Sequence, residues 1–304
     1  MRFVRFDPPP ALAGIGLVRV RDSGRVALGP GRVIPGDDAE TLASLLAAPD
    51  PESRRRDRYG VLALIAAREA LREAGLADAP RRGERCGVMI GTTHASSEGN
   101  GRYAGDLASA TSTLSPSLFV RTTSGAAAAD VACAFRMAGP GQTFASGWTA
   151  GAEALAAAAR AVARGAADLM LAGAVEAPGP IFAHAGALLT EGAAIAVVAP
   201  DAPPDRPRLL AYGRGAGAGG LDAILARLAE DCGLGCAVVV EANESGSHGV
   251  RRAGERTALS VEARSGRLGA VGVVMGCLLA TGMEGPALVV ARDPAGDVAA
   301  LLLG

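Results

Sequence analysis

Three residues of the C-terminal half carry the side chains that zinc prefers: Cys232, Cys236 and His248. Thiolates and imidazoles are the ligands of structural zinc sites, which are closed by four of them. The segment CGLGC has no second ligand pair beside it, so a structural role for these residues is the favoured interpretation. We therefore predict neither a metal ion nor a cofactor for this chain.

The sequence offers two weak candidates for nucleophilic chemistry. His248 lies near Glu244, Ser245 and Ser247, which are residue types found in hydrolytic sites. A solvated loop histidine explains the same residues more simply. Ser146 is not surrounded by a GxSxG elbow, and we interpret it as a residue at the N-terminus of a helix. A thioester hydrolase or acyltransferase that uses Ser146 or His248 remains an alternative hypothesis.

The elements that would position such residues are centred on the stretch 139–176. A turn signal precedes a short apolar run, which predicts a strand. Residues 150–163 are almost all Ala, Leu or Val, and their only charged residues are Glu153 and Arg160. A helix that is apolar on all sides cannot lie on a surface, so this helix should cross the centre of the molecule. Residues 169–175 are a near-continuous apolar run, as expected for a strand buried on both faces.

The order of predicted elements occurs twice, once in residues 1–200 and once in residues 201–304. Each half has a strand, an amphipathic helix, two strands, a helix without a polar face and two more strands. Two buried helices, two sheets and two outer helical layers would stack as α-β-α-β-α in one folding unit. Two Rossmann-like domains would explain the alternation, but not two helices that lack a polar face. Helices are expected at 61–76, 124–138, 150–163, 221–233 and 270–283, and loops or polar excursions at 21–56 and 92–123.

The composition excludes several classes of function. The net charge is −1 and no basic patch is interleaved with aromatic residues, so nothing favours nucleic acid or an anionic membrane as a partner. The N-terminal residues lack the apolar run of a signal peptide, and no stretch is long enough to span a bilayer. The five cysteines are an odd number and lie mostly in apolar runs. We therefore expect reduced cysteines in a cytoplasmic protein.

Several ordered motifs resemble those of the β-ketoacyl synthases, which have the thiolase fold. Asp57, Arg58 and Tyr59 with the helix after them are similar to the family's DRF segment and first helix. The turn at 139–140, the following strand and the buried helix resemble the family's nucleophile elbow. Further segments match in order: GVMIGT (87–92), SPSLFV (115–120), LLTEGAAIAVV (188–198), VEANESGS (240–247) and SGRLGAVG (265–272). The resemblance covers nearly the whole chain and implies a shortened thiolase-like five-layer α/β fold.

The family's catalytic residues are absent from the positions that match them. A ketosynthase uses a thiolate at the N-terminus of the buried helix, where the helix dipole lowers the pKa of the cysteine. Here that position matches Trp148, whose indole is not a nucleophile. The two histidines that stabilise an enolate in the family match Asn243 and Arg267, and the family's lysine falls near Glu262. The resemblance therefore predicts no catalytic residue. Cys133, the alternative nucleophile, lies inside an Ala-rich helix rather than at an elbow.

A chain that keeps the fold but lacks the nucleophile resembles a chain-length factor, the inactive partner of an active ketosynthase in type II polyketide systems. The resemblance implies a heterodimer in which this chain shapes the acyl tunnel of its partner. An acyl carrier protein would then be reached through the partner. The product would be a polyketide, with a polyene suggested by the short chain, or a fatty acyl group. A homodimeric acyl-binding scaffold is the other alternative.

The same resemblance implies which residues contact the partner subunit. Phe119 and Val120 are expected to face the partner's pocket. The strand that starts at Gly141 should pair with the partner across a two-fold axis, because this strand would otherwise be an exposed edge. The interface residues expected on this strand are Gln142, Thr143, Phe144, Ala145 and Ser146.

Overall fold

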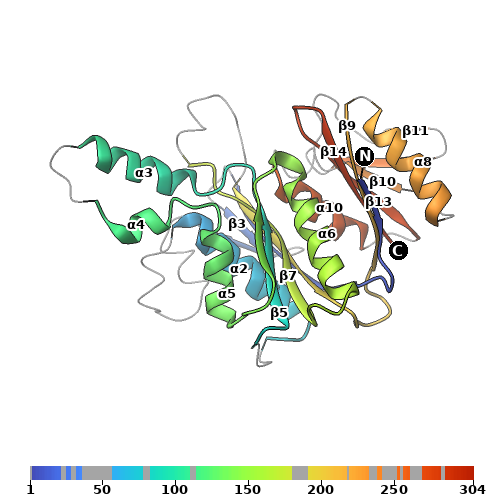
Figure 1. The fold of residues 1–304 in the computed structure, drawn as a ribbon, viewed down its shortest axis with the longest axis horizontal. Coiled ribbons are helices and arrows are strands. Elements are labelled where there is room, and N and C mark those ends of the chain that lie inside the picture. The colour runs from blue at the N-terminus through green and yellow to red at the C-terminus, as the bar shows by residue number, and fades with distance from the viewer. Residues whose placement is uncertain are drawn as a thin grey trace.

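A computed structural model describes residues 2–21, 25–28, 32–35, 57–77, 83–109, 114–179, 191–217, 219–232, 238–241, 252–253, 256–260, 269–281 and 285–304. Figure 1 shows two β-sheets that face each other, with helices between them and outside them. Both labelled chain ends lie at the same sheet, on the side of the molecule that carries α8 (Gly220–Cys232).

The N-terminal sheet has the described strand order β4-β3-β2-β8-β7-β5-β6. Within it, β5 runs parallel to β6 and β7, whereas the remaining pairs are antiparallel. The short strand β6 therefore lies at the edge of this sheet, as predicted. Its strands are β2 (Ala11–Arg21), β3 (Arg25–Leu28), β4 (Arg32–Pro35), β5 (Cys86–Gly91), β6 (Gly141–Phe144), β7 (Leu169–Glu176) and β8 (Gly192–Ala199).

The C-terminal sheet has the described order β1-β9-β14-β13-β10-β12-β11. Its first strand, β1, comes from the start of the chain and pairs antiparallel with β9, so residues of the N-terminal half complete this sheet. The boundary at residue 200 between the two halves stays a prediction. The strands of this sheet are β1 (Arg2–Arg5), β9 (Leu209–Ala216), β10 (Val238–Glu241), β11 (Arg252–Ala253), β12 (Arg256–Ser260), β13 (Ala287–Arg292) and β14 (Asp297–Leu303).

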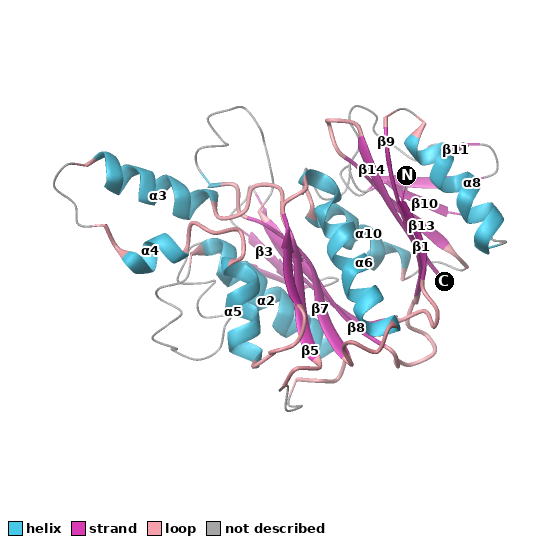
Figure 2. Ribbon diagram, viewed as in Figure 1, coloured by secondary structure: helices cyan, strands magenta, loops and turns pink. Residues whose placement is uncertain are grey.

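Helices cover the sheets in the predicted five-layer order (Figure 2). The outer face of the N-terminal sheet is covered by α2 (Arg58–Glu73) and α5 (Ala126–Phe135). Between the sheets lie α6 (Ala150–Ala163) and α10 (Val271–Ala280), and α8 covers the outer face of the C-terminal sheet. The α-β-α-β-α arrangement expected from the sequence is confirmed. Within the described residues, no helix combines the length and apolar character needed to cross a membrane.

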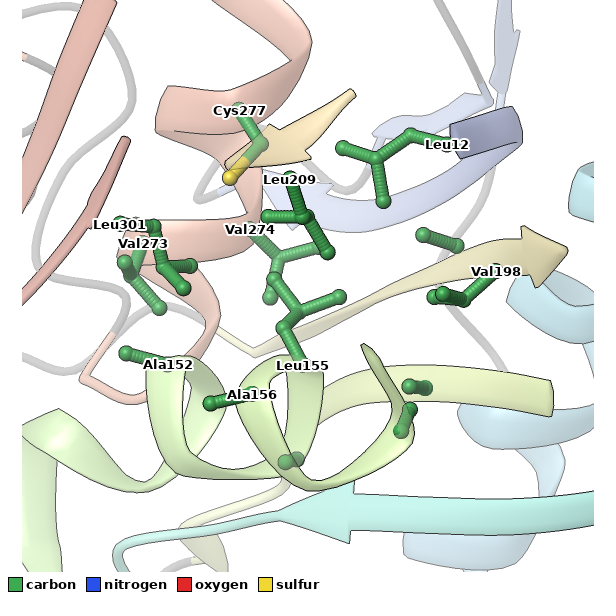
Figure 3. Close-up of a cluster of buried hydrophobic side chains, with 14 of the residues drawn as sticks. Leu12, Ala152, Leu155, Ala156, Val198, Leu209, Val273, Val274, Cys277 and Leu301 are labelled. Atoms are coloured by element: carbon green, nitrogen blue, oxygen red, sulfur yellow. The ribbon is translucent and has the colours of Figure 1, made fainter. Parts of the chain in front are cut away.

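The central layer is buried because α6 and α10 pack on each other and on both sheets. Figure 3 shows Leu155 of α6 and Val274 of α10 in this core, and both side chains are fully buried. The helices approach closely at Gly151, where an added Cβ would lie 2.2 Å from the carbonyl oxygen of Ala270. The predicted burial of two helices without a polar face is therefore confirmed, and the reason is a helix contact built from small residues.

Two segments expected as loops contain regular structure. The region 21–56 includes β3 and β4, which continue from β2 as antiparallel neighbours. The region 92–123 includes α3 (Ser97–Ala108) and α4 (Pro116–Val120). Only Ser97 and Gly99 of α3 are buried, so this helix has no apolar periodicity that would reveal it in the sequence.

Candidate functional site

The start of the central helix α6 is the site that the sequence indicated. Trp148 lies in a single 3₁₀ turn, η2 (Gly147–Thr149), between β6 and α6, and its side chain is half-buried. Thr149 is fully buried, and its hydroxyl lies 3.1 Å from both the Ser146 carbonyl and a carboxylate oxygen of Glu153. The residue predicted to match the family's nucleophile therefore lies in the turn that leads into α6, and it carries an indole.

A carboxylate that sequence reasoning missed contacts this helix start. Asp293 lies just after β13, and its Oδ2 accepts a hydrogen bond of 2.9 Å from the backbone N–H of Trp148. The two residues are 145 positions apart in the chain. The only signal in the sequence is an acidic turn, DPAGD, between two predicted strands, and nothing in that segment points to Trp148.

An ion-pair network joins the first turn of α6 to the C-terminal sheet. Arg214 of β9 lies 3.0 Å from Glu153 and 3.1 Å from Asp297, at the start of β14. The neighbouring Tyr212 is buried, and desolvation followed by the charge of Glu153 raises the pKa of its hydroxyl well above the usual value. Near the start of α6, the carboxylates of Glu153 and Asp297 are therefore both paired with Arg214.

Several predicted site residues lie outside the described residues. These are Asn243, Glu262 and Arg267, together with His248 and Cys236, so their positions stay predictions. Cys232 ends α8, and its side chain is also outside the described part of the chain. Across the described ranges, no group of three or more His, Cys, Asp or Glu side chains is arranged to hold a metal ion.

The alternative nucleophiles lack an activating base where the structure describes them. The Oγ of Ser146 is buried, and no hydrogen-bond partner for it exists among the described residues. Cys133 is exposed on α5, in the outer helical layer and away from the start of α6. Burial raises the pKa of Cys277 to about 12, and it raises the pKa of Cys86 as well, so neither is an activated thiol. These observations do not favour a hydrolase that uses Ser146.

The predicted interface residues lie on two exposed features. On β6, Gln142 is exposed and Thr143 and Phe144 are half-buried, followed by exposed Ala145 and half-buried Ser146. The helices α3 and α4 form an arm that projects from the sheets at the left of Figure 1. On this arm, Phe119 is 55% exposed and Val120 is 56% exposed.

Phe119 and Val120 belong to a wider apolar surface. Leu107 and Leu114 are also exposed on the arm or directly beside it. Phe119 packs against Tyr103 of α3 in a tilted arrangement, with ring centroids 5.6 Å apart, and this contact joins the two arm helices. Large apolar side chains that gather on one protruding element are typical of a protein interface. The sequence named the two residues of α4 but not the arm that carries them.

Buried charges anchor the arm to the body of the protein. Arg121, at the C-terminal end of α4, forms an ion pair with the buried Asp130 of α5.

Asp57 caps the N-terminus of α2, where its Oδ1 accepts a hydrogen bond of 3.1 Å from the Gly60 N–H. Its Oδ2 is buried and has no hydrogen-bond partner within the described residues. Burial, reinforced by the charges of Asp130 and Glu98, raises the pKa of the Asp57 carboxyl.

The raised pKa of Asp57 makes stability depend on pH. Because the folded-state pKa lies above the unfolded value of 3.8, ionisation is less favourable in the fold, and stability falls as pH rises through the folded pKa. Asp57→Asn keeps the capping oxygen without the charge, so urea unfolding at pH 7 should show a higher free energy of unfolding than in the parent. This difference should vanish below pH 3.8. Asp57→Ala also loses the cap and should be less stable than Asp57→Asn by about 1 kcal/mol at every pH. An Asn variant as unstable as the Ala variant at pH 7 would contradict this account.

A buried carboxylate joins the two halves of the protein near this site. Glu176, at the end of β7, is 1% exposed. Its oxygens accept hydrogen bonds from the backbone N–H groups of Thr93 (2.5 Å), His94 (3.2 Å) and Ala270 (3.3 Å). The His94 ring nitrogen Nδ1 lies 3.1 Å from the same carboxylate. Glu176 therefore connects β7, the loop after β5 and the start of α10, and sequence reasoning did not identify this role.

Solved structures with the same fold cover almost the whole chain. The ishigamide ketosynthase/chain length factor has a TM-score of 0.74 at 19% identity, over 97% of this chain and 99% of that chain. AntDE:AntF, a type II PKS acyl-carrier protein in complex with its ketosynthase, has a TM-score of 0.76 at 15% identity, over 99% of both chains. A β-ketoacyl synthase from Burkholderia phymatum has a TM-score of 0.73 at 18% identity, over 97% of this chain and 98% of that chain. At these identities the likeness establishes the thiolase-like ketosynthase fold.

Sequence comparison points to the same family. A polyketide beta-ketoacyl synthase 1 of Streptomyces halstedii is 35% identical in an alignment of 193 residues that covers 55% of this chain and 44% of that protein. The chain thus matches less than half the length of this curated relative. The family model "Beta-ketoacyl synthase, N-terminal domain" matches residues 18–229, which is more than half of the chain. The chain belongs to the β-ketoacyl synthase family.

Proposed function

We propose that this chain is a non-catalytic ketosynthase-like subunit that pairs with an active ketosynthase and shapes its acyl tunnel. The observation that carries this proposal is Trp148 at the start of α6. There, a family member that condenses acyl groups needs a thiolate activated by the helix N-terminus. An indole accepts no acyl group, and its bulk occupies the space next to the helix start. The chemistry would then reside in the partner subunit.

Two surfaces support pairing with another subunit. The edge strand β6 has a free side, since β5 is its only neighbour in the strand order of the described sheet. Beside it, between β6 and α5, lies a groove of about 310 Å³ that is lined in part by Ala128, Ala132, Gln142 and Thr143. An exposed strand edge next to an apolar groove is the geometry that strand addition from a partner requires.

The α3–α4 arm supports a role in shaping the partner's tunnel. The arm projects beyond the sheets, and Phe119 and Val120 of α4 are apolar and exposed. We expect these side chains to reach into the neighbouring subunit and to limit the length of its apolar tunnel by filling it. Among the structures with this fold, one is a ketosynthase/chain length factor and another is an acyl-carrier protein with its ketosynthase. An assembly of this kind in type II polyketide or fatty-acyl biosynthesis is the function we propose.

The mass of the purified complex tests this proposal directly. The chain would be co-expressed with the ketosynthase encoded nearest to it, and the complex would be weighed by native mass spectrometry. We expect a one-to-one heterodimer whose activity disappears when the partner's nucleophilic cysteine is replaced, but persists in Trp148→Ala. A stable homodimer with no affinity for the ketosynthase would instead favour an acyl-binding scaffold. Turnover of an acyl thioester by the chain alone would overturn the proposal.

A further inference from the structure

The carboxylate of Asp293 is held in place at the start of α6 by both of its oxygens. Oδ2 accepts a hydrogen bond of 2.9 Å from the backbone N–H of Trp148, and Oδ1 accepts one of 2.8 Å from the backbone N–H of Ala295. The turn that carries it is closed by two backbone hydrogen bonds of 2.8 Å, from the Asp293 N–H to the Asp297 carbonyl and from the Gly296 N–H to the Asp293 carbonyl. The carboxylate is therefore positioned before any ligand arrives.

The opposite side of this contact is shaped to receive the carboxylate. Gly147 has a φ of +70°, a conformation that L side chains rarely adopt. A Cβ added at Gly147 would lie 2.2 Å from Asp293 Oδ2. Any side chain at position 147 would therefore displace the carboxylate, which makes the glycine and the aspartate a matched pair.

The start of α6 is the place where an anion would otherwise bind. The free N–H groups and the dipole at a helix N-terminus stabilise negative charge, whether it belongs to a thiolate or to a developing oxyanion. Here the Trp148 N–H already donates to a protein carboxylate. Two further carboxylates of the described residues lie on the elements that meet here: Glu153 in the first turn of α6 and Asp297 in the same turn as Asp293. Both are paired with Arg214. The segment of α10 that packs on η2 carries no charged residue, and Arg292 ends β13.

We propose that Asp293 is an internal anion that occupies the turn η2, which leads into the N-terminus of α6, and blocks the degenerate site independently of Trp148. The proposal rests on the proposed function in one respect, since it takes Trp148 as the position that matches the family's nucleophile. Two features then prevent catalysis at this site. Position 148 has no thiol, and the backbone N–H that would stabilise a thiolate there already donates to a carboxylate. Restoring a cysteine alone would leave that cysteine with a raised pKa.

The pKa of a thiol introduced by Trp148→Cys tests this inference. The rate of alkylation by iodoacetamide would be followed against pH, with mass spectrometry of the peptide around position 148 separating it from exposed Cys133. Adding Asp293→Asn, which removes the charge but keeps the shape, should lower that thiol pKa by about one unit. Because nucleophilicity falls with pKa, alkylation at pH 7 should then be about threefold faster.

A second carboxylate in the same turn provides the matched control. Asp297→Asn changes the net charge by the same amount, but Asp297 does not contact the Trp148 N–H. The thiol pKa should therefore stay within about 0.3 units in Trp148→Cys with Asp297→Asn. Equal pKa values with and without Asp293→Asn, or equal shifts from both Asn substitutions, would overturn the proposal. Neither result would touch the proposed function, which the mass of the complex tests separately.

A measurement on the native tryptophan covers the case in which the Trp148→Cys variants fail to fold. Trp148 is the only tryptophan of the chain, so its fluorescence reports on this site alone. Quenching by the iodide anion would be compared with quenching by neutral acrylamide. The ratio of the two quenching constants should rise about twofold in Asp293→Asn and stay unchanged in Asp297→Asn. An unchanged ratio in Asp293→Asn would contradict the assignment of Asp293 as the anion that occupies the site.

Discussion

Phe119→Asp is expected to weaken the heterodimer with the partner ketosynthase by about 100-fold, which corresponds to about 2.7 kcal/mol. Phe119 of α4 is 55% exposed on the α3–α4 arm, so its ring has much apolar area left to bury against a partner. A carboxylate placed in an apolar pocket costs free energy because it loses its hydration without gaining a counter-charge. Surface plasmon resonance or analytical ultracentrifugation of the purified subunits would measure the loss.

Three variants separate an interface effect from a local folding effect. Val120→Asp should weaken the complex as well, and Val120 lies beside Phe119 on the same exposed surface. Ala223→Asp on exposed α8 adds the same charge on the far layer of the protein and should leave the affinity unchanged. Phe119→Leu keeps an apolar side chain and should lose much less affinity than Phe119→Asp. If both Asp substitutions on the arm left the affinity unchanged, the arm would not be part of the interface.

Glu176→Ala is expected to lower the free energy of unfolding by about 3–5 kcal/mol, because several buried N–H groups lose their acceptor. The carboxylate accepts hydrogen bonds from Thr93 and His94 of the N-terminal half and from Ala270 at the start of α10. Since water cannot replace it in this buried position, the cost is that of unsatisfied polar groups rather than of one lost ion pair. Thermal or urea unfolding followed by circular dichroism would measure the loss.

Two further substitutions define the cause of this destabilisation. Glu176→Gln keeps one acceptor oxygen but turns the other into a donor that faces the His94 N–H, so an intermediate loss is expected. Glu230→Ala removes a carboxylate from an exposed i,i+3 pair with Arg227, which should change stability by no more than about 0.5 kcal/mol. A Glu176→Ala variant as stable as Glu230→Ala would show that this carboxylate does not hold the two halves together.

The short-range pattern of the sequence was sufficient to predict the layers. The unbroken apolar character of residues 150–163 predicted a buried helix, and α6 occupies those residues between the two sheets. On β7, Met170, Ala172 and Ala174 pack in the central layer, whereas Leu171 and Val175 pack under α2 and α5. A strand covered on both faces needs apolar residues at every position, which is why a continuous run identifies it. The same reasoning did not predict elements with few buried residues, such as α3.

The chemistry of the candidate site was predictable only in part. The residue type at position 148 follows from the sequence and its motifs alone, and it carries the inference of an inactive subunit. The exposed surface around Phe119 depends on the arm, because α3 and α4 are brought together by the contact between Tyr103 and Phe119. The spatial neighbours of a residue identified from a motif are therefore known only when the elements between the motifs have been placed in the fold.

The amino-acid sequence by itself determined which helices are buried and the order of the five layers, and it places a tryptophan at position 148. Only the tertiary structure decided that β1 joins the C-terminal sheet, that Asp293 binds the Trp148 N–H and that Glu176 reaches Ala270. The physical reason is the separation along the chain of the residues that interact. Periodicity and residue type act over one or two turns of a helix. These contacts instead join residues between 94 positions apart, for Glu176 and Ala270, and 212 positions apart, for Arg2 and Arg214, and they depend on how the sheets and turns are packed.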